Sequence, residues 1–133
     1  RDGHAHDTAH TVFKMVRPGY ACNHAGPCVA GINNTNSVGV EHESAQNGTH
    51  DISLHQYINS ALLYAHDAAE KHIRDWMCQM HGTVAYDPIG RRSDPYAGLF
   101  DICYWWNLVY DIRLDARVWQ YWGMPQPVLL GGR

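Results

Sequence analysis

The sequence lacks a long apolar run and a surplus of basic residues, and each absence argues against one class of protein. No stretch reaches the ~18 consecutive apolar residues that a membrane-spanning helix needs, so we expect no membrane span. Lysine and arginine together number 10 against 13 acidic residues, which gives a formal net charge of −3. Such a chain has no broad basic face to neutralise phosphates, so we expect no nucleic-acid partner.

The sequence also lacks any Cys-x-x-Cys pair, which argues against a zinc finger or zinc ribbon. Two of its four cysteines, Cys22 and Cys28, are near enough in sequence to close a short loop, and His24 lies between them. The other two are Cys78 and Cys103. We favour free thiols or one local disulfide over a cysteine-based metal site, and the redox compartment stays open.

The remaining composition is typical of one globular domain. The chain has 133 residues, of which 45% are apolar and 17% are charged. The ten histidines are unusual, and because neutral imidazole is a common metal ligand they favour a metal site. The stretch after Arg1 has no apolar segment like that of a signal peptide, so we expect a processed chain or a fragment.

Two segments show the residue pattern of β-strands. Residues 11–16 form a β-branched run that ends at Arg17-Pro18-Gly19, where the turn signal is strong. In residues 37–43, Val38, Val40 and His42 alternate with polar residues or glycine, which predicts a strand with two unlike faces.

Helical patterns fill most of the second half of the chain. Ser53 and Gln56 form a capping box, and the apolar period that follows predicts a helix of about six turns that stops before Gly82. A second pattern runs from Leu99 to Arg113, and we expect that helix to pack on the sheet. The sequence therefore predicts an α/β fold in which helices flank a small mixed β-sheet. Residues 118–133 form an aromatic tail rich in Pro and Gly, which either covers the core or meets a protein partner.

Three segments in order resemble motifs of the type-2 N-acetylmuramoyl-L-alanine amidases, a family that includes phage endolysins and is related to the peptidoglycan-recognition proteins. They are residues 22–26 (Cys-Asn-His-Ala-Gly), residues 36–43 (Asn-Ser-Val-Gly-Val-Glu-His-Glu) and residues 90–95 (Gly-Arg-Arg-Ser-Asp-Pro). The resemblance covers roughly residues 11–113, and it implies an amidase-like domain over residues 1–117 followed by the tail.

The resemblance implies roles for five residues. Glu41 corresponds to the glutamate that helps to activate a zinc-bound water, and a strand carboxylate facing a groove suits a general base. Asp94 corresponds to a zinc ligand, and Arg92 falls where a lysine usually stabilises the oxyanion. His24 and Asn36 would border the substrate groove. We expect the carboxylates of Glu41 and Asp94 to face each other across one cleft.

The implied cofactor is zinc, which needs two histidine ligands besides Asp94. His81 lies three residues earlier than the family's second ligand, so it would need a changed loop to reach the metal. The first ligand would be one of His4, His6 and His10, of which His10-Thr11 resembles the family's motif. Alternatively, the histidines near the N-terminus bind metal adventitiously.

The implied function is zinc-dependent hydrolysis of the amide bond between muramic acid and L-alanine, at the bacterial cell wall. The alternative is an amidase fold that has lost its metal and serves as a peptidoglycan-binding or structural module, for instance in a phage particle. Stoichiometric zinc together with release of wall peptide would favour the first.

Overall fold

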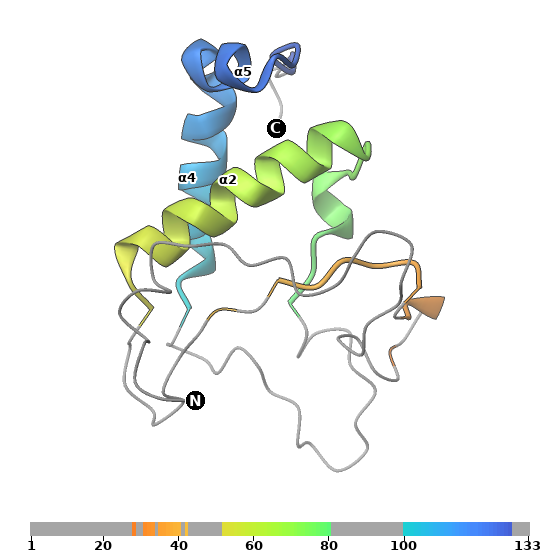
Figure 1. Cartoon of the computed structure of the whole chain (residues 1–133). Coiled ribbons are helices and arrows are strands. Elements are labelled where there is room, and N and C mark those ends of the chain that lie inside the picture. Colours follow the sequence, from red (N-terminus) through yellow and green to blue (C-terminus); the bar gives the residue numbers. More distant parts are fainter. Residues whose placement is uncertain are drawn as a thin grey trace, which may run out of the picture.

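The part of the chain that can be described is helical. The computed structural model describes residues 28, 31–33, 35–40, 42, 52–80 and 100–128. Along the chain these residues form α2 (Leu54–Glu70), the 3-10 helix η2 (Asp75–Met77), α4 (Ile102–Leu114) and α5 (Ala116–Trp122). Figure 1 shows α2 and α4 crossing each other, with α5 over the far end of α4.

The expected α/β fold with a small mixed β-sheet is wrong for these residues, among which there is no sheet. The alternation in residues 37–43 predicted a strand, but residues 37–40 and 42 lie in neither strand nor helix. Val38 is 61% exposed and Val40 is 47% exposed, so the alternation does not bury an apolar face there. The strand predicted for residues 11–16 lies outside the described residues.

Helix α2 begins where the capping box predicted. The Ser53 hydroxyl accepts a hydrogen bond from the Gln56 backbone N–H at 3.3 Å, and the Gln56 side chain accepts one from the Ser53 N–H at 2.8 Å. Both bonds satisfy backbone donors that have no partner inside the helix. The sequence prediction of this helix start is therefore confirmed.

Replacing Ser53 tests the importance of this cap. We expect Ser53→Ala to lower the free energy of unfolding by about 1 kcal/mol, because the hydroxyl acceptor is lost. Ser53→Asp should retain most of the stability, because aspartate also caps helices well. Urea unfolding followed by circular dichroism measures both variants, and equal stability of Ser53→Ala and wild type would contradict the prediction.

Helix α2 ends at Glu70, after 17 residues, which is earlier than the predicted six turns that stop before Gly82. His72 has a φ of 54°, in the left-handed region. The Ile73 N–H donates back to the Ala68 carbonyl at 2.9 Å, and the Lys71 N–H donates to the Asp67 carbonyl at 2.8 Å. The 6→1 bond from Ile73 and the left-handed residue before it match a Schellman-type end, which turns the chain out of the helix. Glycine usually takes that position, so the sequence contains no clear stop signal.

The core lies between α2 and α4. Tyr57 and Ala61 on α2 meet Trp105 and Val109 on α4, and all four side chains are buried. Phe100 stacks on Tyr57 with ring centroids 4.9 Å apart. The second helix was predicted to pack on a sheet, but among the described elements it packs mainly on α2, which supplies the apolar face that the prediction assigned to strands.

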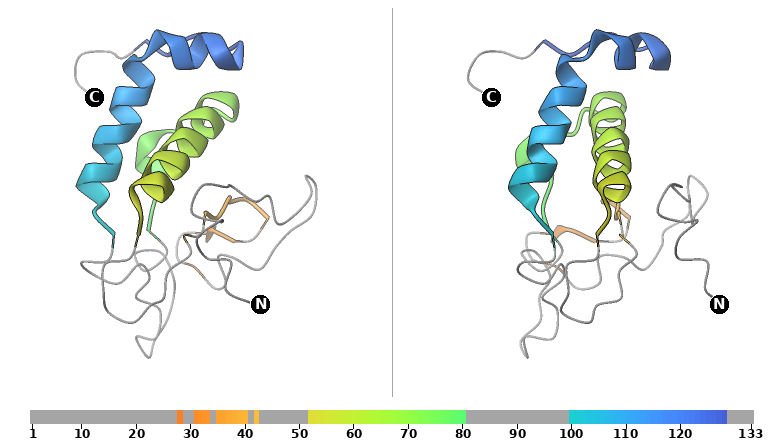
Figure 2. Two further views of the ribbon diagram at one scale, coloured as in Figure 1. Left: turned by 60° about the vertical axis from the view of Figure 1, so that its left-hand side comes forward. Right: turned by 90° about the vertical axis from the view of Figure 1, so that its left-hand side faces the viewer.

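Two hydrogen bonds fix the register of α2 on α4. The Trp105 indole N–H donates to the Ser60 hydroxyl at 2.9 Å, and the Asp101 backbone N–H donates to the Tyr57 hydroxyl at 2.7 Å. Asp101 is also the N-cap of α4. Both bonds lie toward the starts of the helices, and Figure 2 shows α2 and α4 beginning at the same end of the pair.

Asp115 turns the chain between α4 and α5, since it ends the first helix and caps the second. The boundary predicted between residues 117 and 118 falls inside α5. The aromatic side chains of α5 differ in their exposure, so the sequence-based alternatives of a buried and an exposed tail each hold for one of them. Trp119 is only 1% exposed, whereas Tyr121 is 88% exposed.

Candidate functional site

An ion pair between Asp75 and Arg113 joins η2 to α4. Arg113 Nη1 and Nη2 donate to the two carboxylate oxygens of Asp75 at 2.8 and 2.6 Å. The Tyr64 hydroxyl, from α2, donates to the same carboxylate at 2.8 Å. Paired hydrogen bonds of this fork geometry are the strongest form of the arginine–carboxylate contact. Three helical elements therefore meet at one carboxylate.

The charges of this cluster shift the pKa values of its members. Hydrogen bonds from Arg113 and Tyr64 lower the pKa of Asp75, and the hydrogen bonds to Asp75 raise the pKa of Arg113. Burial, reinforced by the Asp75 carboxylate, raises the pKa of Tyr64 above its usual range. Burial also raises the pKa of the nearby Cys78 thiol to about 11. At neutral pH the cluster is therefore an ionised pair beside a neutral phenol and a neutral thiol.

Arg113 also ties the segment after α5 to the helices. Its guanidinium carbon lies 5.7 Å from the ring centre of Tyr64 and 5.8 Å from that of Tyr110. Its backbone carbonyl accepts from the Trp119 indole N–H at 3.1 Å and from the Gln126 amide at 2.9 Å. The cluster thus has a structural role whatever else it does.

A pocket of about 270 Å³ opens beside the ion pair. Its charged lining consists of Arg74, Asp75 and Arg113. Its apolar lining comes from α2, the chain after it, α5 and the final segment, and consists of Ala65, Ala68, Ala69, Ile73, Trp119 and Pro127. An apolar hollow with a few charged groups at one side is the usual form of a small-ligand site. The alanines leave this space open because their side chains are short.

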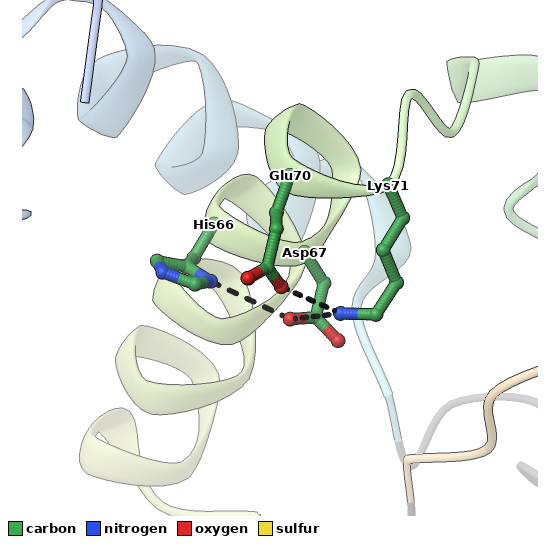
Figure 3. A network of polar contacts seen from close by, with 4 residues as sticks. All are labelled: His66, Asp67, Glu70 and Lys71. Atoms are coloured by element: carbon green, nitrogen blue, oxygen red, sulfur yellow. Dashed lines mark hydrogen bonds and ion pairs between the residues drawn. The ribbon is translucent and has the colours of Figure 1, made fainter. Parts of the chain in front are cut away.

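A second polar cluster lies on α2, where His66, Asp67 and Glu70 could each offer one ligand atom to a metal ion. Figure 3 shows the Lys71 ammonium beside both carboxylates, at 2.8 Å from Asp67 and 3.0 Å from Glu70. The lysine ammonium therefore already balances the charge of these carboxylates and would repel a cation bound beside them. The His66 ring also packs edge-on against Trp122 at 5.2 Å. We assign no metal to this cluster.

Asn36, expected at the rim of a substrate groove, holds a local turn. Its side-chain oxygen accepts from the Asn33 N–H at 2.8 Å, and its amide nitrogen donates to the Gly31 carbonyl at 2.9 Å. These bonds use one donor and one acceptor of the side chain in turn chemistry. Its role in substrate binding stays a prediction.

The other predicted site residues lie outside the described residues. They are the catalytic candidates Glu41 and Arg92, the groove residue His24, and the zinc candidates His10, His81 and Asp94. The expected approach of Glu41 and Asp94 across a cleft is therefore untested, as is the fit of zinc to its three predicted ligands.

Sequence reasoning missed the partly buried ring of His42. Burial lowers its pKa, so the ring is neutral at pH 7, and it lies 5.0 Å from the Phe100 ring. Within the described residues its Nε2 atom is buried and has no hydrogen-bond partner. The alternation in residues 37–43 carried no signal of this, since Val38 and Val40 on the same predicted face are exposed.

The cluster of Asp75, Arg113 and Tyr64 was also missed, since its members are 11 and 38 residues apart and form no motif.

No family model, curated protein or solved structure matches this chain. Among the described residues, no helix has both the length and the apolar character needed to cross a membrane.

Proposed function

We propose that this chain is a binding module whose ligand sits in the pocket beside the Asp75–Arg113 ion pair. The observation that carries the proposal is the combination of an apolar hollow with the Asp75–Arg113 ion pair at its side. Asp75 is fixed by Arg113 and Tyr64 at distances of 2.6 to 2.8 Å, so this ion pair needs little reorganisation when a ligand arrives.

A small-fragment screen tests the proposal on the full chain. We expect fragments to shift the backbone amide signals of Ala65, Ala68 and Ala69 in two-dimensional NMR spectra, because these residues line the pocket. Ala69→Phe should abolish the shifts by filling the space. Fragments that bind only elsewhere, or bind Ala69→Phe as well as wild type, would contradict the proposal.

A second proposal concerns peptidoglycan, which the ordered motifs of the sequence support as the target. On this proposal the chain acts at the bacterial cell wall, either as a zinc amidase or as a binding module without hydrolysis. Zinc, when bound, would polarise the amide carbonyl and acidify a water molecule. His10, His81 and Asp94 would hold it, while Glu41 would move the proton and Arg92 would face the developing oxyanion.

Replacement of Glu41 tests hydrolysis directly. We expect Glu41→Ala to fold normally and to end release of peptide from purified cell walls, because the proton acceptor is gone. The measurements are zinc content, sedimentation with insoluble walls and peptide release, with Glu43→Ala as a neighbouring control. Wall binding without zinc or release would leave only the binding function, and release that survives Glu41→Ala would refute the assignment of the base.

The tail remains a proposed contact surface for a protein partner. Its exposed apolar side chains support this, with Tyr121 at 88% and Val128 at 82% exposure. Tyr121 also lines a second hollow of about 460 Å³ with Leu62, Val118 and Trp122. Such exposed aromatic groups are common where proteins meet.

A further inference from the structure

We infer that the pocket beside the Asp75–Arg113 ion pair selects a monoanion, namely a carboxylate attached to a compact apolar group. This inference rests on the proposed binding function and adds the chemical class of the ligand. The charges, the apolar lining and the size of the pocket support it.

The charged lining gives the pocket a positive balance. Arg74 and Arg113 contribute two positive charges and Asp75 one negative charge, so the formal sum is +1. Arg113 already directs two N–H groups at Asp75, and that pair is close to neutral as a unit. The uncompensated charge is therefore that of Arg74.

Arg74 is placed to meet a ligand. It lies immediately before η2, its side chain is exposed, and no hydrogen bond or ion pair within the described residues engages its guanidinium. A guanidinium offers parallel N–H donors whose spacing matches the two oxygens of a carboxylate. A monoanion would balance the formal charge of +1, whereas a dianion such as a phosphate monoester would leave one negative charge uncompensated in the pocket.

The rest of the lining calls for a compact apolar body. The three alanines, Ile73, Pro127 and Trp119 carry no charge of their own. The volume of about 270 Å³ lies just below the range of roughly 300–1,000 Å³ that is usual for drug-sized ligands. A free organic acid and the C-terminal residue of a peptide share this chemistry.

Matched pairs of ligands separate charge from shape. Benzoate and benzamide represent the free acid, and N-acetyl-L-leucine and its amide represent the peptide end. On the full chain at pH 7 and low salt, followed through the amide signals of Ala65, Ala68 and Ala69, we expect at least one carboxylate to bind about tenfold more tightly than its amide. The pair with the larger ratio of acid affinity to amide affinity shows whether the ligand is a free organic acid or the C-terminal residue of a peptide. Added salt should weaken the carboxylate but not the amide.

Arg74→Gln should remove most of this tenfold preference and leave amide binding unchanged. The control is Arg117→Gln, because Arg117 is also an exposed arginine but is bonded to Asp115 and does not line this pocket. Neither change touches the buried core, so both variants should fold.

Equal affinity for acid and amide in both pairs, or an acid preference that survives Arg74→Gln, would overturn the inference while leaving the binding function intact. The same holds if other fragments bind in the pocket and all four probes fail. Failure of every fragment to bind there would instead overturn the proposed function itself.

Discussion

Trp119→Ala should destabilise the protein by about 3–5 kcal/mol, the range found for loss of a large buried aromatic side chain. Trp119 is 1% exposed and is one of the two largest fully buried side chains among the described residues. Its indole N–H also donates to the carbonyls of Ile112 and Arg113 at 3.2 and 3.1 Å. Truncation to alanine therefore leaves a cavity. It also removes the indole N–H that donates to both carbonyls.

Tyr121 provides the matched control for this prediction. It lies two residues further along α5 and is 88% exposed, so Tyr121→Ala should change the free energy of unfolding by less than about 0.5 kcal/mol. Both variants are measured by urea unfolding followed by circular dichroism, because tryptophan fluorescence would change with the substitution. Similar losses in the two variants would show that burial of Trp119 does not stabilise the fold.

The helices show which parts of the fold could be predicted from the sequence. The start of α2 was predictable because a capping box is a local signal, made by residues three apart that bond to each other. Its end was not, because His72 rather than glycine takes the left-handed position. The strand over residues 37–43 was predicted from alternation, and alternation gives a strand only where a neighbouring strand accepts its hydrogen bonds. The exposed Val38 and Val40 have no such buried face.

The candidate site was beyond prediction for a different reason. Asp75, Arg113 and Tyr64 are ordinary residues for a helical surface, and only the packing of α2 on α4 brings them together. Arg113 was predicted as the last residue of an apolar helical pattern, but its side chain is 10% exposed and paired. A motif search finds residues that act through fixed spacing, and this cluster has none.

Arg113→Met should destabilise the protein by about 1–3 kcal/mol, because it leaves the Asp75 carboxylate without its charged partner. The loss should be smaller than the roughly 3–5 kcal/mol typical of a fully buried pair, since the Asp75 side chain is 37% exposed and water can partly replace the arginine. Methionine retains much of the side-chain volume, so the measured loss reports charge and hydrogen bonding more than cavity formation.

A double-mutant cycle with Asp75→Asn separates the ion pair from other effects of each change. The double variant should lose less stability than the sum of the two single losses, and additive losses would mean that the pair contributes nothing. The pH dependence gives an independent check. Because Arg113 lowers the pKa of Asp75 in the folded state, the pair's stabilisation is present above the unfolded aspartate pKa of about 3.9 and is lost as the pH falls through the lower folded value. Wild type should therefore lose more stability than Asp75→Asn between pH 5 and pH 2, and parallel curves would show that Asp75 titrates normally.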